Sequence, residues 1–369
     1  MNASRAPIPD KGGQAEECLR EYFRSLGSFV IRGVPIREGT DDVTDIDLWV
    51  YTRAAAHSRH IAIVDIKNKK RGKSFERAIW VKGLQAAVRA DEAVIASSGI
   101  SDKAERFSER LDVRVISRSV FDAIVNRYSS NNSRLSSEEL DNAWKKVSID
   151  RSNLKSRMDI TKSKLAGTIT FRSLNAWLDD GAELLKTTVE RERTAGEITR
   201  AAYFCCALIA IGADYLGKHQ SLASQEERRN FFLQGLLFGS ADEDISGAYM
   251  RFTESVVTEF LDGSGSSAAQ VRSGFERAVK AMPMNGLAEY FARPHTSSEL
   301  YRAALALEEA CFSKELVAPR DLASVEAKRI VGLISDYAGL KRKEVLGLRD
   351  DTVAVESGAA NPVEQGKLI

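Results

Sequence analysis

The sequence predicts an α/β domain followed by an all-α domain. Two observations lead to this expectation. Within the first 125 residues short apolar runs alternate with amphipathic segments, whereas the region from about 137 to 350 reads as one helix after another. A polar stretch rich in Ser and Asn, residues 127–139, separates the two parts and is expected to be a linker. At 369 residues the chain is long enough for two domains, each with its own core.

The N-terminal domain, expected over 1–126, is predicted to begin with a helix over 14–26, where apolar residues recur at helical spacing and Gly27 follows. Alternating apolar residues predict three strands after it, a pattern typical of half-buried sheet. The expected order of helix, three strands, helix, strand, helix and strand comprises 14–26, 28–36, 44–51, 60–67, 74–90, 92–99, 101–111 and 113–117. Ser101 or Asp102 is expected to cap the last of these helices.

The remaining sequence predicts an all-α domain over 140–352 and a disordered tail over 353–369. The most apolar run, 201–213, is too short to span a bilayer and is expected to be a buried core helix, so no membrane association is predicted. Nothing in this part points to chemistry. The part is expected to serve targeting, oligomerisation or regulation, either in a homo-oligomer or with a partner protein.

Charge and cysteine content narrow the classes of protein. The formal net charge of +1 argues neither for nor against nucleic-acid binding by the molecule as a whole. Only a local concentration of positive charge can indicate such binding. The four cysteines form no C-x-x-C pair and lie in apolar, helix-like segments. Buried reduced thiols and the lack of a secretory signal at the N-terminus predict a cytoplasmic protein.

Two neighbouring predicted strands each carry acidic residues among apolar ones. Alternate side chains of a strand share a face, so Asp45 and Asp47 point one way, as do Asp65 and Lys67. If these strands pair as an antiparallel hairpin, Asp47 lies beside Asp65. Two adjacent carboxylates are costly unless a cation lies between them, and carboxylate oxygens are the ligands that Mg²⁺ prefers. The pattern predicts a divalent-metal site for phosphodiester hydrolysis, with a lysine for an anionic oxygen.

At these residues the sequence resembles the PD-(D/E)XK nuclease superfamily, most closely its Mrr-like and Holliday-junction-resolvase-like members. The resemblance covers about 1–125 and implies a restriction-endonuclease-like fold with a mixed central sheet. Its four motifs are GGQAEECLREYFRSLG, DIDLWV, VDIKNKK and the run from Ala90 to Ser117. Gln85 follows the D-x-K strand where many relatives carry a polar active-site residue. Arg89 stands where some relatives carry a tyrosine, which leaves the role of Gln85 open.

The resemblance implies a role for each motif residue. Asp47, Asp65 and the backbone carbonyl of Ile66 would hold Mg²⁺, with Mn²⁺ as the expected substitute. Lys67 would orient the attacking water or help to deprotonate it, and would stabilise charge on the phosphate. Glu16 would orient a metal-bound water or help to hold a second ion. Two alternatives stay open: Asp45 in place of Asp47, and Glu17 in place of Glu16.

The segment after the D-x-K strand is strongly basic. Its basic side chains are expected to contact a nucleic-acid backbone beside the site. These residues are Lys69, Lys70, Arg71, Lys73 and Arg77. Trp49 and Trp80 flank the site, and their spacing favours core positions over base stacking.

The sequence as a whole predicts a magnesium-dependent DNA endonuclease, with RNA as an alternative substrate. The Mrr-like resemblance implies a setting in bacterial restriction or antiviral defence. The alternative function is a catalytically silent nuclease fold that acts as a nucleic-acid-binding or assembly subunit with a partner protein. Metal-dependent cleavage that is lost when Lys67 is replaced would discriminate between the two.

Overall fold

The computed structural model describes most of the chain between Lys11 and Gly347. The described ranges are 11–67, 74–130, 133–149, 152–191, 195–241, 273–274, 277 and 282–347. Four of the five basic residues expected to contact nucleic acid, Lys69, Lys70, Arg71 and Lys73, lie outside these ranges. The expected disordered tail, 353–369, also lies outside them.

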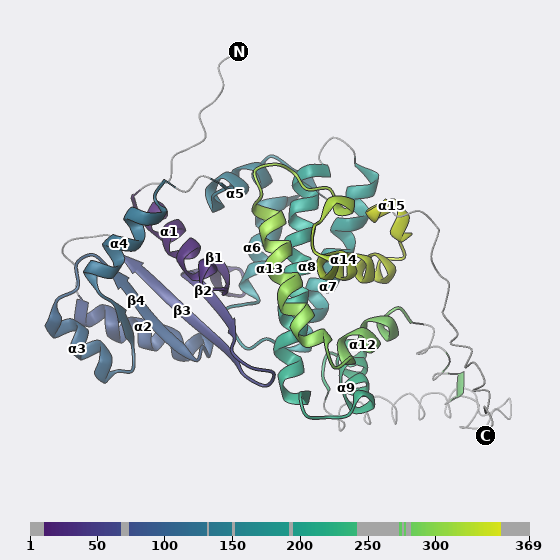
Figure 1. The fold of residues 1–369 in the computed structure, drawn as a ribbon, viewed down its shortest axis with the longest axis horizontal. Coiled ribbons are helices and arrows are strands. Elements are labelled where there is room, and N and C mark those ends of the chain that lie inside the picture. Colours follow the sequence, from purple (N-terminus) through teal and green to yellow (C-terminus); the bar gives the residue numbers. More distant parts are fainter. Residues whose placement is uncertain are drawn as a thin grey trace, which may run out of the picture.

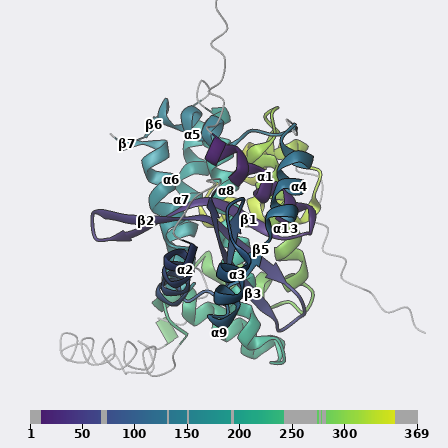
Figure 2. The same ribbon diagram turned by 90° about the vertical axis from the view of Figure 1, so that its left-hand side faces the viewer.

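The N-terminal part has the expected order of elements, followed by one helix that the sequence did not predict. Its elements are α1 (Lys11–Ser25), β1 (Phe29–Glu38), β2 (Asp41–Arg53), β3 (Arg59–Lys67), α2 (Ser74–Val88), β4 (Glu92–Ser97), α3 (Asp102–Arg110), β5 (Arg114–Ile116) and the additional α4 (Arg118–Tyr128). Ser101 caps α3 by accepting a hydrogen bond from the Ala104 N–H at 3.3 Å. The β1–β2 hairpin is longer than expected because it turns at Gly39, which has a φ of +60°. Its tip projects from the protein in Figure 2.

The five strands form one mixed sheet in the order β1-β2-β3-β4-β5, so the coarse prediction of an α/β part with a mixed sheet is confirmed. The pairs β1–β2 and β2–β3 are antiparallel, whereas β3–β4 and β4–β5 are parallel. Leu48 lies opposite Val64 as the last pair between β2 and β3 on the side of Asp65. The register thus places Asp47 and Asp65 directly beyond the same pair.

Helices cover both faces of the sheet (Figure 1). Side chains of α1 and α4 pack with Leu48, Val50 and Val64 on one face. On the other face Trp49, Tyr51 and Ile63 pack with α2 and with the helical part of the chain. Because successive strand residues alternate between faces, Asp47 and Asp65 have the parity of the α2 face.

The rest of the described chain is mostly helical, as predicted, apart from a two-stranded hairpin. Its elements are α5 (Ser137–Lys145), β6 (Ser148–Ile149), β7 (Ser152–Asn153), α6 (Leu154–Ser163), α7 (Phe171–Glu190), α8 (Ala195–Gly217), η2 (Lys218–Gln220), α9 (Gln225–Phe238), α12 (Met284–Ala292), α13 (Thr296–Phe312), η3 (Pro319–Asp321), α14 (Val325–Tyr337) and α15 (Arg342–Leu346). α4 ends at Tyr128 and α5 begins at Ser137, so the connection between the parts is shorter than the expected linker 127–139.

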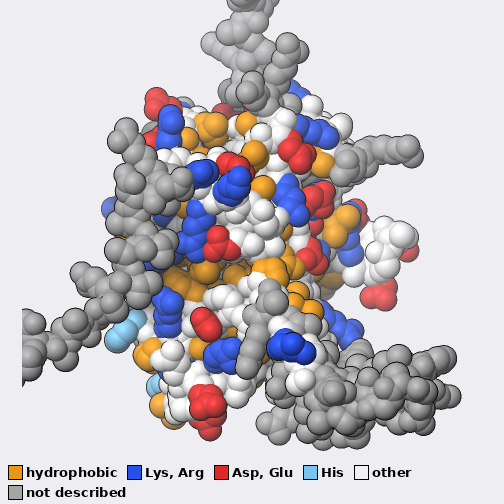
Figure 3. Space-filling model, turned by 90° about the vertical axis from the view of Figure 1, so that its right-hand side faces the viewer, with side chains coloured by type: hydrophobic (Ala, Val, Ile, Leu, Met, Phe, Trp, Pro, Cys, Tyr) orange, Lys and Arg blue, Asp and Glu red, His pale blue; other side chains and the backbone are white. Residues whose placement is uncertain are grey.

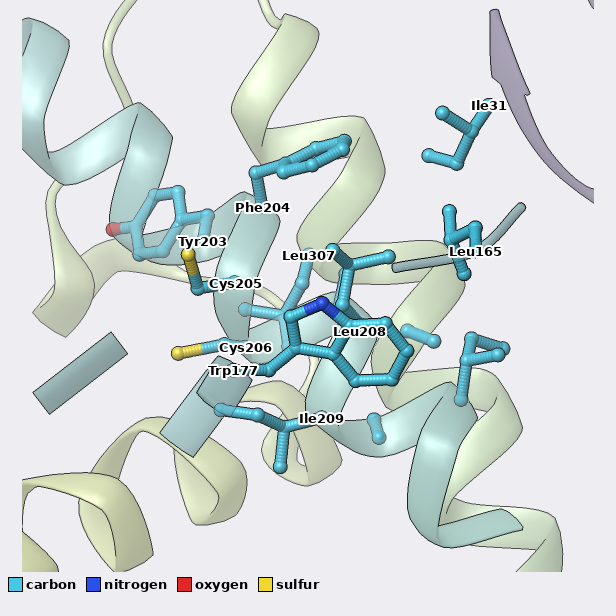
Figure 4. Close-up of a cluster of buried hydrophobic side chains, with 14 of the residues drawn as sticks. Ile31, Leu165, Trp177, Tyr203, Phe204, Cys205, Cys206, Leu208, Ile209 and Leu307 are labelled. Carbon is cyan, nitrogen blue, oxygen red and sulfur yellow. The ribbon is translucent and has the colours of Figure 1, made fainter. Parts of the chain in front are cut away.

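Helix α8 is the centre of the helical part. By length and composition the segment Ala195–Gln220 could cross a membrane, but 83% of its most apolar window is buried inside the protein. The expected core helix over 201–213 is confirmed, because every residue in it is buried. Gly212 lets α7 approach closely, since a Cβ there would lie 2.9 Å from the Trp177 ring. Figure 4 shows Trp177 among the side chains of α8.

The sheet and the helical part share one continuous core. Ile31 of β1 belongs to the same buried cluster as Leu165 and Trp177, and Figure 4 shows Ile31 above Leu165. Buried polar contacts reinforce this interface. Asp214 of α8 accepts hydrogen bonds from Tyr51 (2.6 Å) and from Arg59 (2.7 Å). The helical part is therefore packed firmly on the sheet.

A second set of charges joins α1 to α13. Glu308 of α13 is 2% exposed and pairs with Arg24 at 3.0 Å and with Arg134 at 2.6 Å. Arg134 follows α4 in the chain, so three separate segments meet at this carboxylate. Breaking a buried pair by removing one partner is strongly destabilising, because it leaves an unpaired buried charge.

Candidate active site

The site predicted from the sequence lies where the pairing between β2 and β3 ends. Asp47 and Asp65 directly follow the Leu48–Val64 pair, on adjacent antiparallel strands. The Asp47 Oδ2 accepts a hydrogen bond from the Ile66 N–H at 2.6 Å, which fixes this carboxylate against the end of β3. The strand pairing thus brings Asp47 to the backbone of the D-x-K segment.

The surroundings of Asp47 disfavour its charged form. Burial raises the pKa of Asp47 to about 7, and the carboxylates of Asp65 and Glu16 add to the shift. The Ile66 N–H and the Lys67 ammonium oppose the shift. A cation placed among these carboxylates would remove the repulsion, so the electrostatics of the group suit a cation-binding site.

Asp65 already has a cationic partner. Both of its carboxylate oxygens accept hydrogen bonds from the guanidinium of Arg77, with 2.5 Å between Nε and Oδ2 and a second bond from Nη2 to Oδ1. Asp65 is only 4% exposed. A fork-to-fork pair of this kind is strong, because both bonds are charge-assisted.

The position of Arg77 on α2 explains this contact. Val81 and Gln85 are buried, and Arg77 precedes Val81 by four residues, so the three share one side of the helix. The prediction from the sequence placed Arg77 on a basic nucleic-acid surface and did not include its contact with Asp65. The four-residue spacing to Val81 was the signal that could have found it.

Trp80 lies beside the same arginine. The Arg77 guanidinium carbon is 4.8 Å from the centre of the Trp80 ring. Trp49 is buried as predicted, but the core position predicted for Trp80 is wrong, because Trp80 is 41% exposed. Trp80 immediately precedes the buried Val81 and therefore lies off the buried side of α2.

Glu16 comes from α1, on the opposite side of the sheet from α2. Its carboxylate accepts a hydrogen bond from Arg32 Nε at 2.7 Å. Burial raises the pKa of Glu16, while Arg32 opposes the shift and Asp45 and Glu138 increase it. Glu16 is near enough to influence Asp47 electrostatically, but in this structure its direct partner is Arg32.

The alternative residues occupy different surroundings. Glu17 faces the start of α5, where it accepts a hydrogen bond from the Ser137 N–H at 2.8 Å and pairs with Arg20 at 3.1 Å. Asp45 is exposed and lies opposite Pro35 of β1. Arg32 also donates to Glu17, at 2.9 Å, so this arginine does not distinguish Glu17 from Glu16. Glu16 influences the pKa of Asp47, and the choice of Glu16 and Asp47 stays a prediction.

The hydrogen bonds of Gln85 lead away from Asp47 and Asp65, so its active-site role stays a prediction. Its amide nitrogen donates to the carbonyls of Ala90 (3.3 Å) and Asp91 (3.0 Å). The Asp91 carboxylate accepts a hydrogen bond from the Ile61 N–H near the beginning of β3. Asp65 lies near the other end of that strand. Gln85 is buried and ties the end of α2 to the loop that follows.

Lys67 is exposed at the end of β3. Because it lies two residues after Asp65, it has the same strand parity, and its ammonium lowers the pKa of Asp47. The lysine is thus close enough to act on the charge of the carboxylate group while remaining accessible to a substrate.

Within the residues that the structure describes, no three His, Cys, Asp or Glu side chains are already gathered to hold a metal ion. The chemistry of the donors nevertheless fits a hard cation such as Mg²⁺, because Asp47 and Asp65 supply carboxylate oxygens. The guanidinium on Asp65 and the raised pKa of Asp47 indicate the same need for positive charge.

Comparison of the chain with protein-family models, with curated proteins and with solved structures found no match. The resemblance to nucleases therefore rests on the motif residues and on the order of elements. Among those residues, the geometry links Asp47, Asp65 and Lys67 most closely.

Proposed function

We propose that this protein is a metal-dependent nuclease that hydrolyses phosphodiester bonds, with DNA cleaved internally as the main substrate. One observation carries the proposal: Asp47 and Asp65 lie directly beyond the last pair between β2 and β3, with Lys67 two residues further on. Burial raises the pKa of Asp47 to about 7, and repulsion by neighbouring carboxylates adds to the shift, which a bound cation would offset.

Each side chain has a distinct task in this proposal. Asp47 and Asp65 would hold Mg²⁺ or Mn²⁺, and the Ile66 N–H keeps the Asp47 carboxylate in place through a 2.6 Å bond. The exposed ammonium of Lys67 would stabilise negative charge on the phosphate. A bound divalent ion supplies a water of lowered pKa at neutral pH. Arg32 holds Glu16 near this group.

The nucleic-acid surface is proposed on the N-terminal part. Lys67 ends β3 and Arg77 lies on α2, and the basic residues of the sequence between them are expected to contact a nucleic-acid backbone. On the face of the helical part in Figure 3, acidic and basic side chains are interspersed where described residues form the surface. The described residues on this face therefore form no continuous positive track. Targeting, oligomerisation or regulation is the role that we propose for the helical part.

The experiment that tests the proposal is plasmid cleavage by the purified full-length protein. Supercoiled, linear and single-stranded DNA are incubated with Mg²⁺, Mn²⁺ or EDTA, together with the variants Asp65→Asn and Lys67→Ala. We expect metal-dependent nicking or linearisation by the wild type, and a loss of roughly two to four decades in rate in each variant.

Two controls make the result specific to the site. Lys82→Ala removes another lysine of the N-terminal part, one whose partner is Asp112 on the surface, and it should cleave normally. Asp45→Asn tests the exposed neighbour of Asp47 and should also cleave normally. Cleavage that persists in Asp65→Asn and Lys67→Ala would show that the activity does not arise from this site.

A second function is favoured by the Asp65–Arg77 pair. If the guanidinium permanently takes the place of a metal, the domain is a silent nuclease fold that binds nucleic acid or a partner protein. In that case neither Mg²⁺ nor Mn²⁺ gives cleavage of any DNA or RNA, while nucleic-acid binding persists in EDTA. Activity that emerges only when a second protein is added would support an assembly subunit.

A further inference from the structure

Arg77 binds the carboxylate of Asp65, which the proposed nuclease needs as a metal ligand. It binds both oxygens of Asp65, and Asp65 is 4% exposed. An unpaired carboxylate is costly to bury, so the guanidinium provides the positive charge that this position requires. In a metal-loaded site the ion would provide the same charge. Arg77 and the metal therefore compete for one acceptor.

The surroundings of Arg77 also allow its side chain to move away from Asp65. Its side chain is 29% exposed, so the guanidinium can reach solvent without disturbing the buried side of α2. The Trp80 ring lies 4.8 Å from the guanidinium and is itself partly exposed. Stacking on Trp80 would keep the released cation next to Asp65, where the phosphate of a bound nucleic acid would lie.

We propose that Arg77 is a resident cation that holds Asp65 in the metal-free protein, gives way to a divalent metal, and then binds a substrate phosphate. The inference rests on the proposed nuclease function. Because metal releases Arg77 and nucleic acid gives it a new partner, each ligand strengthens the binding of the other. The device keeps metal affinity low until a substrate is present.

The first test measures Mn²⁺ affinity without nucleic acid, by isothermal titration calorimetry of the full chain at pH 8. If Arg77 competes for Asp65, Arg77→Ala should bind Mn²⁺ roughly tenfold or more tightly than the wild type, because the competent state is no longer in the minority. The matched control is Arg110→Ala, which removes a guanidinium of α3 that lies 5.4 Å from the Phe107 ring. Its Mn²⁺ affinity should equal that of the wild type.

A second variant protects the test against a folding defect. Arg77→Lys keeps a positive charge beside buried Asp65, but an ammonium cannot bridge two carboxylate oxygens as a guanidinium fork does. Its Mn²⁺ affinity should lie between those of the wild type and Arg77→Ala. Equal or weaker Mn²⁺ binding in folded Arg77→Ala, or in Arg77→Lys where the alanine variant does not fold, would overturn the inference.

The second test measures whether Arg77 moves from Asp65 to a phosphate of the bound nucleic acid. Binding of a fluorescent DNA duplex is measured with and without Mn²⁺ in the slow Lys67→Ala background. Mn²⁺ should strengthen DNA binding by a larger factor in Lys67→Ala than in Lys67→Ala/Arg77→Ala. An equal gain in both would refute the transfer step.

Failure of this inference can be told apart from failure of the proposed function. A wild type that binds Mn²⁺ and cleaves DNA, with unchanged Mn²⁺ affinity in the Arg77 variants, would overturn the inference alone. A wild type and an Arg77→Ala variant that both bind no Mn²⁺ and cleave no nucleic acid would overturn the two together.

Discussion

Replacement of Asp47 by Asn should make the metal-free protein more stable. Burial raises the pKa of Asp47 from the usual 3.8 to about 7 in the folded state, and the neighbouring carboxylates contribute. The unfolded chain therefore loses the proton near pH 4, whereas the folded protein keeps it up to about pH 7. Stability is lost steadily as the pH rises between these values and stays low above pH 7.

The size of the effect follows from the shift. A pKa raised by about three units corresponds to a penalty of roughly 4 kcal/mol above pH 7, since each unit is worth about 1.4 kcal/mol. At pH 5 less than half of that penalty has developed. Asparagine carries no charge and can still accept the Ile66 N–H bond through its Oδ1. The stability gained by Asp47→Asn should thus grow by roughly 3 kcal/mol from pH 5 to pH 8.

The assay is urea unfolding in EDTA at pH 5 and pH 8, with Asp45→Asn as the matched control. Asp45 is exposed, so its replacement should change the free energy of unfolding by no more than about 0.5 kcal/mol at either pH. The same increment at both pH values for Asp47→Asn would refute the reasoning. Added Mn²⁺ should narrow the difference in stability between the two proteins at pH 8, because it would bind the wild type and not the variant.

Three further predictions concern residues outside the proposed metal site. Asp214→Asn should lower the free energy of unfolding by roughly 3–5 kcal/mol in urea, because it leaves the guanidinium of Arg59 buried without its carboxylate. Gly235→Ala should lower the melting temperature and cost about 1–3 kcal/mol, since a Cβ there would lie 2.3 Å from the Phe171 ring. Gln85→Ala should cost about 1–2 kcal/mol in unfolding but leave Mn²⁺ affinity unchanged by calorimetry, since Gln85 binds carbonyls away from Asp65.

The local pattern of the sequence predicted the frame of the N-terminal part well. Alternation within 44–51 and 60–67 predicted two strands, and their antiparallel pairing sets Asp47 beside the end of β3. Helix α4 was missed because only Phe121 and Ile124 of its eleven residues are buried, which is a weak helical pattern beside the polar stretch that follows.

Contacts between distant segments left no signal in the sequence. Arg24 and Glu308 are 284 residues apart in the chain, and neither stands out among the charged residues around it. The Asp65–Arg77 pair spans only 12 residues. It was missed for another reason: Arg77 follows a run of lysines, and that run suggested a solvent-facing cation rather than one on the buried side of α2.

The helical part meets the sheet on the same strand that carries the site. Tyr51 of β2 donates to Asp214 of α8, and Asp47 lies four residues earlier on that strand, about 13 Å away along an extended chain. A second connection runs through Arg32, which pairs with Glu16 at 2.7 Å and with Glu138 of α5 at 2.6 Å. A movement of α8 would therefore act on β2, which carries Asp47, and a movement of α5 would act on Glu16 through Arg32. These contacts give the helical part a physical means of controlling the proposed nuclease site without contributing a residue to it.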